Sequence, residues 1–271
     1  MRPTILVTND DGIDSDALGP LVDALAEVGD VQTIVPDQNA SGTSHSITLY
    51  RPLRVERTRL RTGQPAYSTD GSPTDCVRLA VLGFLKTRPS LVVSGINRGA
   101  NLGDDITYSG TVAAAMEGLL ADLPSIAISL AYSGADADYG PAAAFAALLA
   151  RNILDRGFEP DALLNVNVPA LPKDRILGVE VTRLGKRTYR DQMIERLDPY
   201  GNPYYWVGGP AVSEIAEPGT DVHAVREGKI SVTPIHLDLT SPRLVDELAT
   251  WDWGWSGPVE VAADQPLLGE R

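Results

Sequence analysis

Residues 5–12 read ILVTNDDG, and this junction between an apolar run and two adjacent carboxylates indicates the fold class. A short, β-branched run is typical of a central strand buried on both faces. Thr8, Asn9, Asp10 and Asp11 follow it, and in open α/β sheets ligands bind beyond the carboxyl ends of the strands. Neighbouring carboxylates repel each other at neutral pH unless a cation shares the site, so the pair predicts the anchor of a divalent metal. The alternative is an acidic turn in which Asp14 or Ser15 caps the next helix.

The composition is that of an ordinary globular protein with a sizeable core, since 43% of the 271 residues are hydrophobic and 22% are charged. A formal net charge of −13 argues against binding along a nucleic-acid duplex, which needs a basic face. Small phosphorylated substrates stay possible if a cation bridges the repulsion. The single cysteine, Cys76, excludes an intrachain disulfide and fits a reducing compartment. With no signal-peptide pattern and no apolar run long enough to cross a membrane, we expect a cytoplasmic protein.

Strand and helix patterns alternate along the first part of the chain. We expect strands at 4–8, 31–35, 91–94, 125–130 and 163–168, and helices at 15–28, 72–86, 111–120 and 141–154. This rhythm predicts an α/β fold with a doubly wound, mostly parallel sheet and right-handed crossovers. Between 43 and 69 the alternating runs predict a hairpin excursion, and 95–108 predicts a polar loop.

The rhythm breaks down after residue 169. We therefore expect a core at 1–169 and a smaller C-terminal portion at 170–271, with strands at 179–184 and 230–234. Turn signals at 199–203 predict a protruding hairpin at about 186–206. Its aromatic residues would suit a subunit interface, and the tail adds three tryptophans that must dock on the chain itself or on a partner. These residues are Tyr200, Tyr204, Tyr205 and Trp206 in the hairpin and Trp251, Trp253 and Trp255 in the tail.

Three further polar segments are predicted at the ends of strands or at a helix start. Ser41, after the second strand, offers a hydroxyl ligand, and Asn97, after the strand at 91–94, offers a carbonyl oxygen. Such oxygen ligands suit Mg²⁺ or Mn²⁺, whereas the three histidines make an all-histidine cage improbable. The hydroxyls of Ser109 and Thr111 open a helix, where backbone N–H groups bind anions. The alternatives are a turn role for Ser41, a left-handed turn at Asn97 and helix capping by Ser109 or Thr111.

Six motifs together resemble the SurE family, the stationary-phase survival proteins. They are TNDDG at 8–12, PDQNASGTSHSIT at 36–48, STDGSPTDCV at 68–77, SGINRGANLGDDITYSGTVAAAMEG at 94–118, LNVNVP at 164–169 and ISVTPIHLDLT at 230–240. The resemblance implies a Rossmann-like core, a metal-dependent phosphatase for nucleoside monophosphates (a 5′- or 3′-nucleotidase), and homodimers or homotetramers built partly through an exchanged hairpin. It implies one divalent ion per subunit, Mg²⁺ or Mn²⁺, on Asp10, Asp11, Ser41 and Asn97. Its phosphate-side residues correspond to Asn101, Ser109, Gly110 and Thr111.

Two kinds of nucleophile fit these residues: a metal-activated water with one carboxylate as base, or direct attack by Asp10 or Asp11. A rival hypothesis is a sensor that binds a nucleotide or phosphate in the same crevice without turnover. Another is an interaction protein that works through the aromatic hairpin and the tail.

Overall fold

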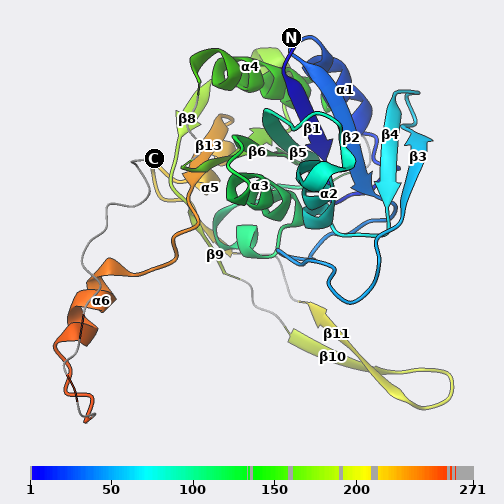
Figure 1. The fold of residues 1–271 in the computed structure, drawn as a ribbon. Helices are drawn as coiled ribbons and strands as arrows, with labels where there is room; N and C mark the ends of the chain where they lie inside the picture. Colours follow the sequence, from blue (N-terminus) through cyan, green and yellow to red (C-terminus); the bar gives the residue numbers. More distant parts are fainter. Residues whose placement is uncertain are drawn as a thin grey trace. The chain divides into compact units, whose positions relative to one another are not determined.

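The computed structural model describes residues 2–132, 134, 137–157, 161–188, 192–208, 213–254, 257 and 260. The chain forms two compact units, Met1–His236 and Leu237–Arg271. The first unit is built around a nine-stranded sheet (Figure 1). Its strand order is β3-β4-β2-β1-β5-β6-β7-β13-β8.

Most strands of this sheet run parallel, as the alternating pattern predicts. The parallel set is β1 (Thr4–Thr8), β2 (Asp30–Pro36), β4 (Pro65–Thr69), β5 (Leu91–Arg98), β6 (Ser125–Ala131) and β7 (Leu163–Pro169). The edges are mixed: β3 (Val55–Arg59) pairs antiparallel with β4, β13 (Ile230–Ile235) pairs antiparallel with β7, and β8 (Val179–Val181) pairs parallel with β13. The predicted α/β class is confirmed, and the strands after residue 169 extend the same sheet.

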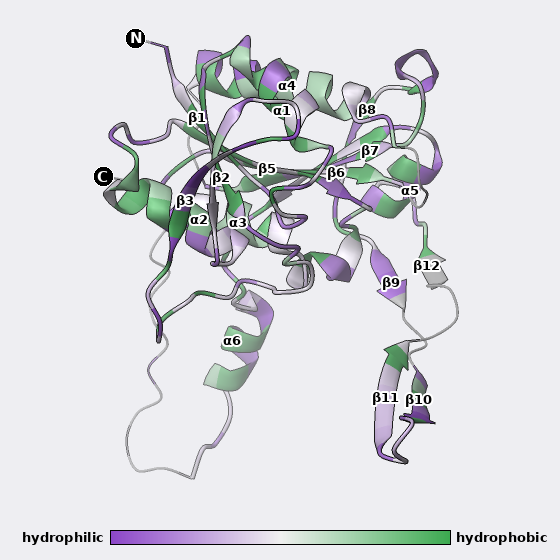
Figure 2. Cartoon of the chain, turned by 90° about the vertical axis from the view of Figure 1, so that its right-hand side faces the viewer, coloured by the Kyte–Doolittle hydropathy of each residue, from purple (hydrophilic) through white to green (hydrophobic). Residues whose placement is uncertain are grey.

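Helices cover both faces of the sheet. Figure 1 shows α1 (Leu18–Ala26) and α4 (Gly140–Arg156) on one face and α2 (Pro73–Leu79) and α3 (Gly110–Leu120) on the other. The alternation of β1 divides its side chains between two hydrophobic clusters, with Ile5 and Val7 on one side and Leu6 on the other. Much of the central strand β5 is coloured hydrophobic in Figure 2, in keeping with a strand buried on both faces. The parallel pairing of β1 with β5, in which Thr8 lies opposite Ser94, places the carboxyl end of β1 beside β5.

Two local predictions differ from the structure. β5 continues through Arg98, where a polar loop was expected from residue 95, and its register against β6 shifts between Gly95 and Asn97. A Cβ on Gly95 would lie 2.2 Å from the carbonyl oxygen of Ile128, so only glycine fits this crossing. The helix expected at 72–86 is α-helical only to Leu79 and ends in a π-helical turn, η1 (Ala80–Phe84), where Gly83 has a φ of 109°.

The remaining short helices lie in connections. They are the 3₁₀ turns η2 (Gly103–Thr107) and η3 (Lys173–Arg175) and the helix α5 (Asp221–Arg226). In the second unit the described residues form α6 (Pro242–Ala249). Among the described residues, no helix is both long and apolar enough to cross a membrane.

The predicted hairpin is confirmed as β10 (Gln192–Leu197) paired antiparallel with β11 (Pro203–Gly208). The strands that flank it in the sequence, β9 (Lys186–Thr188) and β12 (Ser213–Ile215), pair antiparallel with each other. Of the three tail tryptophans, Trp251 and Trp253 lie with their ring centroids 5.6 Å apart, and Trp255 lies outside the described residues.

Candidate functional site

Asp10 and Asp11 lie two and three residues after the end of β1, at the carboxyl edge of the parallel sheet. Asp10 is 3% exposed, and its two carboxylate oxygens accept hydrogen bonds from the Thr111 hydroxyl at 2.5 Å and the Thr111 backbone N–H at 3.1 Å. Asp11 is half-buried and accepts a hydrogen bond at 3.2 Å from the backbone N–H of Arg98, the residue after Asn97. The pair therefore joins the ends of three elements, β1, β5 and α3.

Burial is the main reason why both carboxyl groups have raised pKa values. It raises the pKa of Asp10, while the hydrogen bonds from Thr111 act in the opposite direction. Burial and then the charge of Asp10 raise the pKa of Asp11 to about 6, while the hydrogen bond and the charge of Arg98 lower it. Two adjacent carboxylates whose ionised forms are disfavoured make a strong site for an added cation.

The start of α3 packs directly on Asp10. A Cβ on Gly110 would lie 2.8 Å from the Cβ of Asp10, so glycine permits this approach of the helix N-terminus. The Ser109 hydroxyl accepts a hydrogen bond from the Val112 backbone N–H at 3.1 Å, which is the capping role considered as an alternative. Thr111, by contrast, points its hydroxyl at a carboxylate. The helix start thus brings polar donors and positive dipole to the acidic pair.

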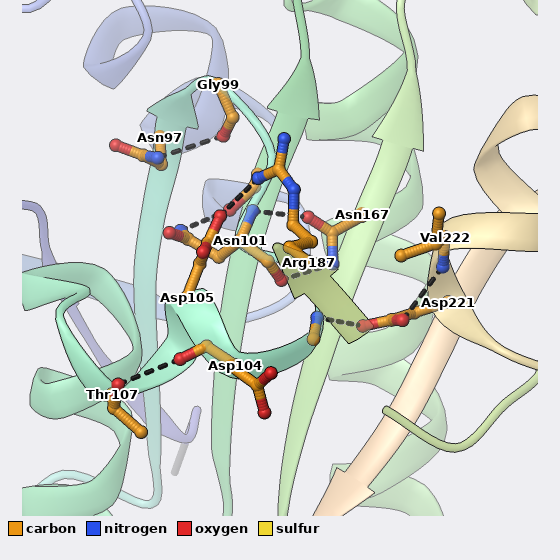
Figure 3. Close-up of polar contacts among 12 residues, drawn as sticks. Asn97, Gly99, Asn101, Asp104, Asp105, Thr107, Asn167, Arg187, Asp221 and Val222 are labelled. Carbon is orange, nitrogen blue, oxygen red and sulfur yellow. Dashed lines mark hydrogen bonds and ion pairs between the residues drawn. The ribbon is translucent and has the colours of Figure 1, made fainter. Parts of the chain in front are cut away.

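The loop that carries Ser41 also contacts this edge. The Ala40 backbone N–H donates to the Asp10 carbonyl at 2.7 Å, and Ser41 itself is exposed, its backbone N–H bonded to Asn39 Oδ1 at 2.9 Å. The amide nitrogen of Asn97 donates to the Gly99 carbonyl at 2.9 Å (Figure 3), so its oxygen is the atom that Asn97 can offer to a ligand. The ligand roles predicted for Ser41 and Asn97 stay predictions.

Asn101 belongs to a buried amide network. Its side-chain nitrogen donates to Ser129 Oγ at 2.8 Å, and its backbone exchanges two hydrogen bonds with the Asn167 side chain, at 2.8 and 3.0 Å (Figure 3). The Asn165 amide also donates to its carbonyl, at 2.9 Å. These contacts hold the glycine-rich loop to β6 and β7. They give Asn101 a structural role beside the phosphate contact predicted for it.

Sequence reasoning did not single out the groups that shape the loops around the acidic pair. Asn9 folds the turn after β1, donating to the Gly12 carbonyl at 3.0 Å and accepting from the Gly12 N–H at 3.2 Å. His45 contacts Glu117 of α3 at 2.9 Å, and Arg78 of α2 contacts the same carboxylate at 3.1 Å. Separations of 39 and 72 residues leave no local pattern from which these contacts follow.

One capping interaction did carry a local signal. Asp75 lies three residues after Ser72, the spacing of a capping box, and the two residues do form one at the start of α2. The buried Asp75 carboxylate also accepts hydrogen bonds from the backbone and hydroxyl of Thr48, at 3.0 and 2.6 Å. It thereby fastens the end of the Ser41 loop to α2.

The donor set is compatible with a hard divalent cation. Among the described residues, no three His, Cys, Asp or Glu side chains gather in one place, so the ligands that these residues could add to the two carboxylates are neutral oxygens. Hydroxyl, amide and carboxylate oxygens are what Mg²⁺ and Mn²⁺ prefer. Cys76, buried in the core and with its pKa raised by that burial, has no part in the acidic pair.

Comparison with known proteins places this arrangement in context. Residues 5–191 match the model of the family described as survival protein SurE. The chain is 50% identical over 250 residues to a 5′-nucleotidase SurE of Geobacter sulfurreducens, covering 92% of this chain and 93% of that protein. A 5′-nucleotidase SurE of Chloroflexus aggregans is 47% identical over 250 residues, with 92% and 99% covered. The crystal structure of a SurE protein from Aquifex aeolicus superposes with a TM-score of 0.77 at 42% identity, covering 91% of this chain and 98% of that one.

Proposed function

The chain belongs to the SurE family, and we propose that it is a divalent-metal-dependent nucleotidase that hydrolyses nucleoside monophosphates to nucleoside and phosphate. Relatives that are about half identical over nearly the whole chain are named 5′-nucleotidases, which favours an enzyme over a phosphate-sensing binding protein. The observation that carries the proposal is the acidic pair at the end of β1, in which the buried Asp10 is held against the N-terminus of α3 by two hydrogen bonds from Thr111.

The proposed ligands of one Mg²⁺ or Mn²⁺ ion are Asp10, Asp11, Ser41 and Asn97. When bound, such an ion supplies positive charge that polarises a phosphoryl oxygen and lowers the pKa of water. The carboxylates contribute the negative charge that holds the cation. The same two carboxylates are also the candidate base or nucleophile of the reaction, which the geometry leaves open.

The phosphate would lie against the start of α3. There the Ser109 hydroxyl, which only accepts a hydrogen bond in the capping contact, would donate to a phosphate oxygen, and the helix dipole would favour the negative charge. Thr111 would contribute by holding Asp10 in place through its hydroxyl and its backbone N–H. Gly110 lets the helix backbone come close to Asp10, and Asn101 holds the glycine-rich loop after β5 in place. We further propose a homodimer or homotetramer and a cytoplasmic location, in keeping with the exposed aromatic hairpin and the buried free Cys76.

The test is phosphate release from nucleoside monophosphates with Mg²⁺, Mn²⁺, Co²⁺ or Ni²⁺. We expect metal-dependent release, and we expect Asp10→Asn or Asp11→Asn to lower turnover at least 100-fold while the far-ultraviolet circular dichroism stays native. Near-normal turnover in either variant contradicts the metal assignment. A folded, metal-loaded wild-type protein that releases no phosphate would support the sensor instead.

Acid quench during turnover distinguishes the two candidate nucleophiles, since only direct attack by a carboxylate leaves phosphorylated protein.

A further inference from the structure

The loop after β2, residues 37–48, carries Ser41 and is fastened at several points. The Ala40 N–H bonds to the Asp10 carbonyl at 2.7 Å, and the Ser44 N–H bonds to the Tyr108 carbonyl at 3.2 Å. Further along, the Ser46 carbonyl accepts from the Ser72 hydroxyl at 2.7 Å. In each of these contacts the loop contributes a backbone atom, so the contacts fix the path of the loop without involving its side chains.

One side chain of the loop, that of His45, also anchors it. His45 Nε2 lies 2.9 Å from Glu117 Oε2, and the Glu117 side chain is only 10% exposed. Arg78, from α2, lies 3.1 Å from the other oxygen of the same carboxylate. A mostly buried carboxylate with two basic partners is a fixed anchor, because leaving it unpaired would be costly.

Glu117 lies on α3, seven residues and thus about two turns after Gly110. The first turn of this helix contacts Asp10, and its third turn holds the Ser41 loop through His45. One rigid helix therefore supports both the acidic pair and the loop that is proposed to complete the metal site.

We propose that His45, held by Glu117, is a positioning residue that keeps the Ser41 loop in its metal-binding conformation. This inference rests on the proposed function, in which Ser41 is a metal ligand. Groups that orient ligands without touching the ion typically change metal affinity 10–100-fold when they are removed. His45→Ala should therefore weaken metal binding by about that factor.

Arg78 provides a matched control. It bonds to the same carboxylate as His45 but comes from α2, so Arg78→Met perturbs Glu117 without detaching the loop. His45→Gln is the conservative variant, because its amide nitrogen can donate to Glu117 as the imidazole does. If the role of His45 were merely to pair a buried carboxylate, His45→Ala and Arg78→Met would behave alike.

The first measurement is amide hydrogen exchange of the metal-free protein over residues 38–47. We expect His45→Ala to speed the exchange of the Ala40 and Ser44 amides by about tenfold or more. These amides donate to the carbonyls of Asp10 and Tyr108, which lie outside the loop, so the hydrogen bonds break when the loop moves away. His45→Gln should restore part of the protection, and Arg78→Met should leave it unchanged. Unchanged exchange in His45→Ala, or equal acceleration in Arg78→Met, overturns the inference.

The second measurement is Mn²⁺ binding by titration calorimetry, with Ser41→Ala as a reference. We expect weaker binding in Ser41→Ala and His45→Ala and near-normal binding in Arg78→Met. If Ser41→Ala binds Mn²⁺ as the wild type does, the proposed ligand set fails. If Ser41→Ala is weakened but His45→Ala is not, the positioning role alone fails, even where the loop exchanges faster. Should His45→Ala not fold, His45→Asn, whose shorter side chain does not reach Glu117, is compared with Arg78→Met, and equal effects of the two reject the role.

Discussion

Asp10 and Asp11 are neighbours in sequence, yet the protein treats them differently. Asp10 is almost fully buried and receives two hydrogen bonds from Thr111, whereas Asp11 is half-buried and receives one from the Arg98 backbone. The sequence predicted that the two carboxylates would share a cation. It could not predict the Thr111 contact, because that depends on how closely α3 approaches across 101 residues of chain.

The pKa of Asp11 leads to a prediction about stability. Burial and the charge of Asp10 raise that pKa from 3.8 to about 6, so between these pH values the folded protein binds more protons than the unfolded chain. The contribution of Asp11 to the free energy of unfolding therefore falls as pH rises through this window, and the penalty is complete above pH 6. Asp11→Asn should make the metal-free protein more stable than wild type above pH 6, by on the order of 1–2 kcal/mol, with the difference vanishing below about pH 4.

Thermal unfolding of metal-free wild type and variant between pH 4 and pH 8 measures this difference. Asp14→Asn is the matched control, because it makes the same chemical change at an exposed carboxyl group nearby. Saturating Mn²⁺ should reverse the order of stability, since the cation compensates both carboxylates only in the wild type. A wild type that stays the more stable protein in the absence of metal at pH 8 would contradict a costly acidic pair.

At the scale of elements, the apolar runs predicted the central strands well because burial on both faces leaves a continuous hydrophobic pattern. The segment from Gly95 to Asn97 was missed for the opposite reason. Its polar, glycine-rich composition resembles a loop, whereas β6 still pairs with it across a register shift. The antiparallel placement of β13 against β7 was also not predictable, since strand partners far apart in sequence leave no local signal.

The start of the hairpin segment is tied to the glycine-rich loop by two acidic side chains. Arg187 of β9 forms an ion pair with Asp105 of η2, with the side chains 17% and 15% exposed. Asp221, at the start of α5, accepts hydrogen bonds from the Gly103 and Gly185 backbones at 2.8 and 2.7 Å. The loop that presents Asn101 is therefore held from the C-terminal part of the unit as well as from the sheet.

A double-mutant cycle tests this connection. Because both partners are mostly buried, Arg187→Met and Asp105→Asn should each lower the free energy of unfolding by about 1–3 kcal/mol, and the double variant should lose less than the sum. Both variants should also raise KM more than they lower kcat, because they loosen the loop that is proposed to contact the phosphate and leave the carboxylates in place. Chemical denaturation and steady-state kinetics are the measurements.

The exposed ion pair of Arg183 and Glu217 is the control cycle. Its atoms are 2.9 Å apart, similar to other ion pairs in the protein, but its side chains are 61% and 62% exposed. Its coupling should be near zero because water screens the charges. Equal coupling in the two cycles would show that burial is not what makes the Arg187 pair matter.

On the scale of the whole molecule, sequence patterns predicted the layered sheet, the hairpin and the sheet edge at which Asp10, Asp11 and Asn97 lie. They predicted less well how that site is held together. His45, Glu117 and Arg78 come from three segments, and His45 and Arg78 have a contact here only because Glu117 lies between them. Such contacts arise only when the helices have packed, so a single sequence shows them as scattered charges.

The hairpin β10–β11 gives the last prediction. The register pairs Ile194 with Trp206 on one face and Met193 with Val207 on the other, and these side chains are 44%, 64%, 69% and 76% exposed. A two-stranded hairpin with apolar side chains on both faces is marginal alone in water and is stabilised when a second copy covers it.

Replacing Ile194 and Trp206 together by serine should therefore shift the protein toward smaller oligomers, by tenfold or more in the dissociation constant, since aromatic anchors dominate interfaces. Light scattering after size-exclusion chromatography, over a range of concentrations, measures the mass. Leu82→Ser is the control, because Leu82 is 76% exposed and lies on η1, outside the hairpin. If the hairpin variant keeps the wild-type mass at every concentration, the hairpin does not hold the assembly together, because removing the apolar side chains from one of its faces would then have no effect on association.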